Sequence, residues 1–491
     1  MKKLLVSSYS LLLLFCYSML VSDVRSTLVV SLGFTNSGAE KFITHAASSA
    51  DGIVRSQSGS NHRIVKGTDG SFILGIIPSG IIHPHTKCYL TAGMDIDPEA
   101  FLKEVDFLKS KGIDITNRVW ISSKAHLVFP FYKTLDTEME KRYKGITDIG
   151  AKKGTGASAA YKRLRLSIRI GDLYNKDHFD PLLKDIIDFT NDLIKLFKTE
   201  VPFCTEQCLN TNDLKKDAAS QDAKLSFEKC FTSCAIEPIN FNSLSKQYIS
   251  YAQRLKPFIK DDVELHINNA IKEGLKIVIG GSNGAFNDLL LGPYPYVAPL
   301  TTTTSGICAA AGIGPSRIGH VLGVIPAYTT SIGDGPLPTE FTNSDLTKKI
   351  VHAQEKSCFN IVKKARYGWI DLVLLRQAIL INGIDSIAIS KLDELDDFDE
   401  ILICYDYTID DKSCDYFPND PTLYKKIKPI YLPPFKGWKK SIAHAKKFTD
   451  LPPEARTFVK KIEMLCGVPI NFISVGPRQD QIITVKDLLP W

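Results

Sequence analysis

The chain has 491 residues, enough for one large α/β domain or for two to three ordinary domains. Its composition is 44% hydrophobic and 23% charged, which is ordinary for a globular protein and excludes a disordered chain. The net charge of +6 comes from 60 basic and 54 acidic residues, so a dedicated polyanion surface is excluded and no nucleic-acid partner is expected. The denser run from Lys162 to Arg165, with Arg169, is either a solvated face or a phosphate contact.

Residues 1–26 are predicted to be a signal peptide. Lys2 and Lys3 precede an apolar run over residues 4–20, and Val24-Arg25-Ser26 places small residues where a signal peptidase cleaves. The mature domain would then span residues 27–491, in the secretory lumen or outside the cell, without membrane contact once the leader is removed. Two alternatives stay open. The leader is retained as an anchor, because its apolar run approaches the length that spans a bilayer, or it is not functional and the protein is cytoplasmic.

After the leader, short apolar runs alternate with helical periodicity, and this pattern predicts an α/β fold. We expect a single large domain in which helices flank a central, mostly parallel β-sheet. Residues 28–32 are almost continuously apolar, as in a parallel strand that is buried on both faces. A helix is predicted to begin at Asp97, where an acidic N-cap is followed by Pro98 and then by apolar positions.

Similar signals continue along the chain. They predict a buried strand at 276–279, an amphipathic helix at 371–380, a strand at 386–389 and a last long helix from Pro452-Pro453 to Gly467. No linker rich in Pro, Ser or Gly divides the chain. The exception to the regular alternation is residues 200–238, whose polar middle indicates an insertion that carries cysteines.

Eleven cysteines are present, and ten remain when Cys16 of the leader is set aside. An even number suits a secreted disulfide protein. Two pairs with the same spacing predict a helical hairpin closed by two bridges, with a zinc site as the alternative: Cys204 and Cys208, Cys230 and Cys234. Cys404 and Cys414 bracket a predicted β-hairpin and could face one another. Free buried thiols are the expectation for the others: Cys88, Cys308, Cys358 and Cys466.

Several unusual short sequence motifs follow one another along the chain. They include Ile77-Pro78-Ser79-Gly80, Arg169-Ile170-Gly171-Asp172-Leu173, Gly292-Pro293-Tyr294-Pro295, Gly333-Asp334-Gly335-Pro336, Gly368-Trp369-Ile370-Asp371 and Lys391-Leu392-Asp393. In order and spacing they resemble the adenylosuccinate synthetase family, from residue 28 to residue 476. The resemblance implies a fold related to P-loop NTPases, GTP and Mg²⁺ as cofactors, and a homodimer. The implied reaction phosphorylates O6 of IMP with GTP, after which the amine of L-aspartate displaces the phosphate.

The end of the site that would bind guanine is kept. Lys391 and Asp393 match the family's Lys-x-Asp word, whose carboxylate accepts hydrogen bonds from the guanine edge. Ser474, Gly476 and Pro477 match the loop that packs around the base. The alternative for these residues is an ordinary turn at the end of a strand.

The end that would carry out the reaction is altered. Where the family reads Gly-Asp-Glu-Gly-Lys-Gly-Lys, this chain reads Thr35-Asn36-Ser37-Gly38-Ala39-Glu40-Lys41. Asn36 replaces the Asp that serves as general base and magnesium ligand, and an amide cannot take a proton from the purine ring. Only Gly38 and Lys41 persist as candidate cofactor-binding residues, and no metal ligand is assigned. His62 matches the catalytic His if a two-residue gap is allowed; without the gap, Ile64 takes that place.

The candidate substrate residues divide between two ligands. For IMP they are Lys152, Lys153, Asn283 and Arg165, the last in the position of an arginine that reaches into the neighbouring subunit. For aspartate they are Lys363 and Arg366, in a run where Ala365 removes one guanidinium group. A lysine cannot reproduce the bidentate hydrogen bonding by which an arginine binds a carboxylate. Thr302 is a further substrate candidate, with neither ligand assigned to it.

These substitutions lead to two main hypotheses. The first is a degenerate member, exported from the cytosol, that keeps guanine-nucleotide binding at most. The second is an active synthetase with a substitute base, for which Asp69, Asp95 or a water molecule are candidates. A third possibility is that the altered loop serves a different ligase or a ligand other than GTP.

Overall fold

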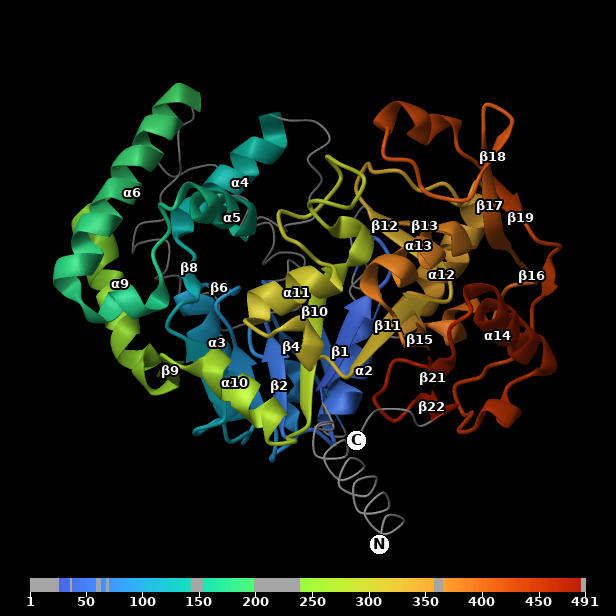
Figure 1. Ribbon diagram of the computed structural model, residues 1–491, viewed down its shortest axis with the longest axis horizontal. Coiled ribbons are helices and arrows are strands. Elements are labelled where there is room, and N and C mark those ends of the chain that lie inside the picture. The colour runs from blue at the N-terminus through green and yellow to red at the C-terminus, as the bar shows by residue number, and fades with distance from the viewer. Residues whose placement is uncertain are drawn as a thin grey trace, which may run out of the picture.

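The structure, a computed structural model, describes residues 26–35, 38–58, 63–67, 70–142, 153–197, 239–356 and 365–486. Its centre is a ten-stranded sheet with the order β22-β21-β15-β11-β1-β10-β2-β5-β7-β9 (Figure 1). All neighbouring pairs are parallel except β21 and β22. In chain order the strands are β1 (Ser26–Ser31), β2 (Gly52–Arg55), β5 (Lys87–Leu90), β7 (Val119–Ser122), β9 (Ile259–Lys260), β10 (Ile277–Gly284), β11 (His320–Pro326), β15 (Ser386–Ser390), β21 (Ile470–Ser474) and β22 (Ile482–Thr484).

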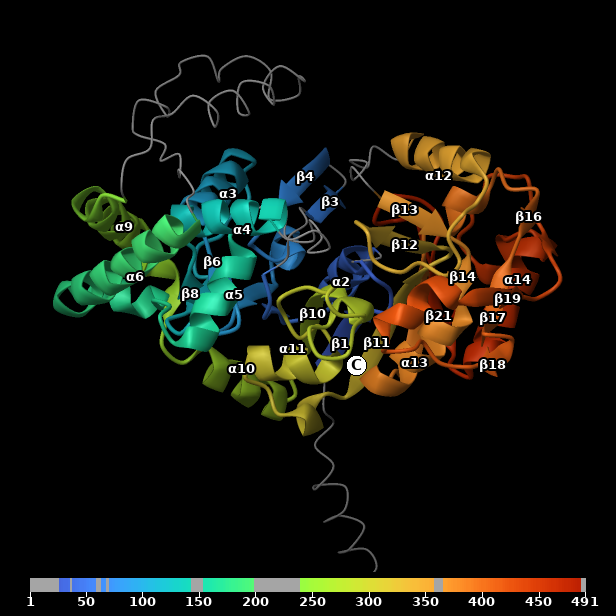
Figure 2. The same cartoon turned by 90° about the horizontal axis from the view of Figure 1, so that it is seen from above.

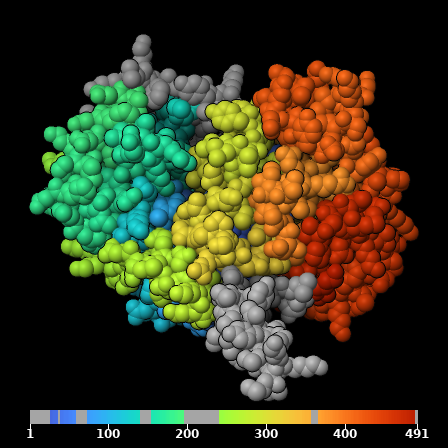
Figure 3. Space-filling view, in the orientation of Figure 1, coloured from blue at the N-terminus to red at the C-terminus, as the bar shows by residue number. Residues whose placement is uncertain are grey.

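Helices cover both faces of this sheet. They are α2 (Ala39–Ala47), α3 (Pro98–Ser110), α4 (Pro130–Arg142), α5 (Thr155–Leu164), α6 (Lys176–Phe197), α9 (Phe241–Leu255), α10 (Val263–Lys272), α11 (Thr304–Ala311), α12 (Ser344–Lys356), α13 (Leu372–Asn382) and α14 (Pro453–Cys466). The blue-green helices α3 to α9 lie on one side of β1 and the orange-red helices α12 to α14 on the other (Figure 1). In the space-filling view, the yellow part of the chain fills the surface between these two groups (Figure 3).

Smaller sheets complete the fold. They are β3 (Arg63–Gly67) with β4 (Gly70–Leu74), β6 (Asp95–Ile96) with β8 (His126–Leu127), β12 (Thr329–Ile332) with β13 (Ala365–Gly368), β16 (Glu400–Ile401) with β20 (Phe435–Lys436), and β14 (Ile370–Asp371) with β17 (Ile403–Ile409), β18 (Lys412–Cys414) and β19 (Lys428–Tyr431).

The predicted α/β class with a mostly parallel central sheet is confirmed. In β1 the side chains of Leu28 and Val30 enter one hydrophobic core and that of Val29 enters the other. This alternation explains the continuous apolar run, since both faces of the strand are buried.

Ser26, at which the predicted leader ends, is the first residue of β1 and is buried. Within the described ranges, no helix is long and apolar enough to cross a membrane.

The predicted helix starts are also confirmed. The Asp97 carboxylate accepts from the backbone N–H groups of Glu99 and Ala100 at 3.1 and 3.2 Å, and α3 follows directly. Asp371 caps α13 in the same way. These side chains satisfy N–H groups that the first turn of a helix leaves without a partner.

The cysteine predictions have mixed outcomes. The hairpin at Cys404 and Cys414 exists, but the predicted pairing of these thiols is wrong, because both are free and Cys414 lies opposite Tyr407. The expectation of free buried thiols is confirmed for Cys88 and Cys308, whereas Cys466 is free but only partly buried. Cys358 and the insertion at 200–238, with its four cysteines, lie outside the described residues.

Candidate functional site

The candidate site lies where the carboxyl ends of several parallel strands meet, the usual place for a ligand in an open α/β sheet. Ser31 at the end of β1 pairs with Gly284 at the end of β10. After β1 the chain leads into α2, which lies beside the central strands in both ribbon views (Figure 2). Gly38, the N-cap of α2, has a φ of 85° and lies against Ser390 at the end of β15.

Lys41, on the first turn of α2, crosses to the loop after β21. Its Nζ donates to Ser474 Oγ at 2.7 Å, to the Gly476 carbonyl at 2.6 Å and to the Gln481 carbonyl at 2.9 Å. Burial lowers the pKa of Lys41 to about 7, although the nearby carboxylates of Asp393 and Asp480 act in the opposite direction. Three acceptors match the three N–H bonds of an ammonium group, so this geometry holds the charged form.

Asp393 lies in the short 3₁₀ helix Leu392–Leu395 that follows β15. Burial, and after it the neighbouring Glu394 carboxylate, raises its pKa to about 7, against the charge of Lys41. Lys391 precedes it with a φ of 59°, and its Nζ donates to the hydroxyl of Tyr328 at 3.2 Å. The structure therefore brings Lys41, Asp393, Ser474 and Gly476 together, with the half-buried Pro477 next in the chain.

A second group of predicted residues surrounds Gly284. Asn283 is buried on β10 immediately before it. The Thr302 hydroxyl donates to the Gly284 carbonyl at 2.8 Å, and the backbone N–H of Thr302 donates to Asp288 at 2.6 Å. Asn283 and Thr302, both predicted to bind substrate, are thus neighbours beside the end of β1.

Lys153 lies apart from these residues, next to α5. Burial first, and then the positive charge of Arg55, lower its pKa to about 8. The nearby Glu104 carboxylate accepts from the backbone N–H groups of Gly75, Ile76 and Ile77. Arg165 is exposed at the C-terminal end of α5, with a φ of 64°.

Arg366, predicted to bind aspartate, is engaged within the protein. Its Nε donates to the Gly333 carbonyl at 2.8 Å, its Nη2 to the Gly335 carbonyl, and its Nη1 to Glu340 at 2.7 Å. Three of the five N–H groups of the guanidinium group are used in this way, and one on each terminal nitrogen remains for a ligand.

Several predicted residues lie outside the described part of the chain: Asn36, His62, Asp69, Lys152 and Lys363. Asp95, a candidate substitute base, is buried, and its Oδ1 accepts from Ser158 at 2.5 Å and from Lys162 at 2.7 Å. No group of three or more His, Cys, Asp or Glu side chains is arranged as a metal site among the residues described. With Asn36 in place of an acid, the donor set does not fit a magnesium ion held by protein carboxylates.

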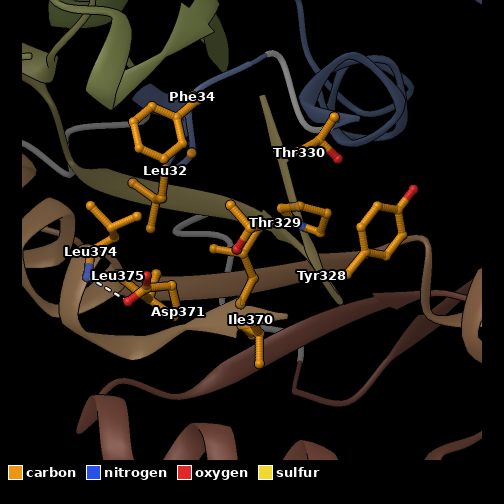
Figure 4. A pocket seen from close by; sticks show the side chains of 12 residues that line it. Leu32, Phe34, Tyr328, Thr329, Thr330, Ile370, Asp371, Leu374 and Leu375 are labelled. Carbon is orange, nitrogen blue, oxygen red and sulfur yellow. Dashed lines mark hydrogen bonds between the residues drawn. The ribbon is translucent and has the colours of Figure 1, made fainter. Parts of the chain in front are cut away.

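The sequence did not indicate three side chains near Lys391, namely Tyr328, Gln354 and Glu394. Glu394 lies directly after Asp393 in a segment rich in acids, so its position in the sequence gave no separate signal. Close by, Asp371 and Tyr328 line a small cavity of about 30 Å³ (Figure 4). That volume holds a few water molecules and is too small for a nucleotide.

The chain is similar over most of its length to proteins of one known family. The family model "Adenylosuccinate synthetase" matches residues 28–483. An adenylosuccinate synthetase of Clostridium botulinum (strain Langeland) is 32% identical over 469 residues, covering 94% of this chain and 99% of that protein. The Clostridium novyi protein of the same name is 33% identical over 464 residues, with the same coverage.

Solved structures agree with this fold. The fully ligated adenylosuccinate synthetase of Plasmodium falciparum superposes with a TM-score of 0.79 at 24% identity, covering 94% of this chain and 100% of that one. The succinoaminodeoxyadenylate synthetase of cyanophage S-2L has a TM-score of 0.53 at 12% identity and covers 95% of its own chain. At these identities the two structures show the fold alone. The family model and the clostridial relatives go further, and the chain belongs to the adenylosuccinate synthetase family.

Proposed function

We propose that this family member binds a guanine nucleotide, while the ligation of IMP to L-aspartate is slowed or lost. The observation that carries the proposal is the convergence of Lys41, Asp393, Ser474 and Gly476, from segments up to 435 residues apart. An ionised Asp393 accepts from the N–H groups of a guanine edge, and the loop after β21 packs beside it. Adenine does not present the same row of donors.

The loss of ligation is supported at the other end of the site. Asn36 is an amide where the family has an acid, and removing a general base typically costs ~10²–10⁴-fold in rate. Ala39 and Glu40 take the places of a lysine and a glycine, which weakens the attraction for phosphate. Arg366, one of the groups that would hold aspartate, is bound to Gly333, Gly335 and Glu340.

The second candidate function is an active synthetase with a substitute base. It is favoured by the clostridial relatives, which carry the synthetase name and cover 94% of this chain. Asp95 is a poor base for this purpose, since it is buried and its Oδ1 already accepts from Lys162 and Ser158. Asp69 or a water molecule would then have to take the proton.

Two further parts of the proposal concern the setting of the protein. We propose a homodimer in which Arg165 reaches the partner's IMP site, supported by the exposure of that side chain.

We also propose a place along the secretory route, supported by residues 1–26. Mass spectrometry of the protein purified from its source checks the second point: a chain that begins near Thr27 supports it, and an intact Met1 in the soluble cytosolic fraction contradicts it.

Calorimetric titration of the purified chain with GTP and Mg²⁺ tests the main proposal. ATP is the specificity control, because the cyanophage synthetase binds dATP as an energy donor. IMP and aspartate are then added and phosphate release is followed. We expect GTP binding without IMP-dependent release. The matched control restores the family loop with T35G, N36D, S37E, A39K and E40G, which should increase release. IMP-dependent release by the unmodified chain would favour the active synthetase, and no GTP binding would refute both candidates.

A further inference from the structure

A buried polar network lies under Lys391. Tyr328 follows β11, Gln354 is on α12, Tyr367 is on β13 and Glu394 is in the 3₁₀ helix after β15. The Tyr328 hydroxyl donates to Glu394 Oε2 and accepts from Gln354 Nε2 at 2.9 Å and from Lys391 Nζ at 3.2 Å. Gln354 Nε2 also lies 3.3 Å from Glu394 Oε2, and Gln354 Oε1 accepts from the Tyr367 hydroxyl at 3.0 Å.

The geometry of this network leaves Tyr328 little freedom. Tyr328, Tyr367, Glu394 and Gln354 have exposed fractions of 0, 3, 3 and 6%. A phenol hydroxyl has one donor and two acceptor positions, and here all three are used. In the close-up view the hydroxyl of Tyr328 points away from the end of the cavity that holds Asp371 (Figure 4). The ring also lies under the ammonium group of Lys391, 5.5 Å from its centre.

The charged side chains around the proposed guanine-binding site form two pairs. Two lysines and two acids are gathered here, on α2 and on the segment after β15. Lys41 interacts with Asp393, and Lys391 Nζ lies 3.9 Å from Glu394 Oε1. Glu394 thus provides a counter-ion for Lys391 from the side away from the base loop. A buried charge without such a partner would be unfavourable.

We propose that Glu394, acting through Tyr328, is a positioning residue that draws the Lys391 amine away from Asp393. The Asp393 carboxylate then stays available to the N–H groups of a purine base such as guanine. This inference rests on the proposed guanine-nucleotide site and deepens it, because it names the groups that set the selectivity of that site. Without the charge of Glu394, the Lys391 amine would be released toward Asp393, two residues along the chain, and would compete with the base.

Two variants test the inference. E394Q keeps the shape and an acceptor but removes the charge, and Y328F removes the hydroxyl that joins the network. We expect each to weaken GTP binding by ~10-fold in Kd without strengthening ATP binding, which equals the loss of about one charge-assisted hydrogen bond. Y161F is the matched control, since it removes a buried tyrosine hydroxyl that bonds Thr190 at 2.8 Å on the other side of the sheet.

A second readout separates positioning from a merely structural role. Acetic anhydride labelling followed by mass spectrometry reports the reactivity of Lys391, with the exposed Lys348 as internal reference. We expect labelling of Lys391 to increase several-fold in E394Q and Y328F and to stay unchanged in Y161F. E394Q should also lower the pH below which GTP binding weakens. Glu394 raises the pKa of Asp393, whose other charged neighbours are Lys41 and Asp396.

The outcomes are distinguishable. Unchanged GTP affinity and unchanged Lys391 labelling overturn the inference, and so does weaker GTP binding with unchanged labelling, because the effect then lies elsewhere. If the unmodified chain binds no GTP, the proposed function fails, but labelling still decides whether Glu394 holds Lys391. If E394Q does not fold, as judged by thermal melting, Q354M removes a neutral member of the same network and is judged by the same two readouts.

Discussion

Among single residues, Lys41 and Asp393 show how burial and charge act against each other in this site. Burial alone favours the neutral form of both groups, which lowers the pKa of Lys41 and raises that of Asp393. Their mutual attraction favours the charged forms. Three acceptors around Lys41 stabilise its ammonium form, whereas the Asp393 anion is favoured by its own backbone N–H and by the charge of Lys41, which burial outweighs. Asp393 is therefore the group whose protonation should respond to pH.

Guanine binding should accordingly weaken as the pH falls. The pKa of Asp393 is raised to about 7, so lowering the pH through 7 protonates it and removes an acceptor from the base site. We expect the affinity for guanosine, a ligand without phosphate groups that titrate, to fall by up to ~10-fold per pH unit below pH 7. Calorimetry between pH 8 and pH 6 measures this change. D393N should bind weakly and independently of pH, and tighter binding of the unmodified chain at pH 6 would contradict the argument.

At the scale of elements, the start of α2 depends on a close approach to β15. A Cβ at Gly38 would lie 3.2 Å from Ser390 Cβ and 3.3 Å from Ser390 Oγ, in a backbone conformation with a φ of 85°. Gly112, after α3, has a φ of 73° and nothing within 4 Å of such a Cβ. The two glycines therefore share the backbone conformation and differ only in the contact.

G112A should lower the free energy of unfolding by about 1 kcal/mol, because a left-handed conformation is unfavourable for alanine. G38A should lower it by more, since Ser390 must also move. Urea unfolding of both variants against the unmodified chain measures the difference. Equal losses would show that Ser390 gives way without cost and that α2 tolerates a displacement from β15.

For the whole molecule, local signals carried most of the fold prediction. The apolar run of β1 and the caps at Asp97 and Asp371 depend on neighbouring residues, and the structure confirms all three. The contacts of Lys41 join residues 433 to 440 positions apart, so nothing near Lys41 in the sequence could indicate them. The same holds for the internal contacts of Arg366, which are set by how β13 packs against the loop after β12.

The hairpin of β17 and β18 shows how a small local detail changes a prediction. The positions of Cys404 and Cys414 suggested a turn centred between them. The actual turn is Asp410-Asp411, both with positive φ, which pairs Ile409 with Lys412 and Tyr407 with Cys414. Two-residue turns of this kind fix the register of a hairpin. Cys404 instead lies opposite Tyr431 of β19, so its thiol cannot meet Cys414.

Assembly is the property of the whole molecule that is most open to experiment. Arg165 is held at the end of α5 by a backbone bond from its N–H to the Lys162 carbonyl at 3.0 Å, and its side chain is exposed next to Leu164, which is 53% exposed. We expect the purified chain to sediment as a dimer in which Arg165 of one subunit completes the IMP site that contains Lys153 of the other.

Subunit mixing tests this arrangement. R165A and K153A should each lose IMP binding in calorimetry, because each homodimer lacks one group in both of its sites. In a mixed dimer, one site combines an intact Lys153 with an intact Arg165 from the opposite subunit, and the other site lacks both. Equal mixing with free exchange should therefore restore about one site in four, as twofold symmetry requires. If Arg165 instead acts within its own subunit, mixing restores nothing, because every chain then carries a defect in its own site.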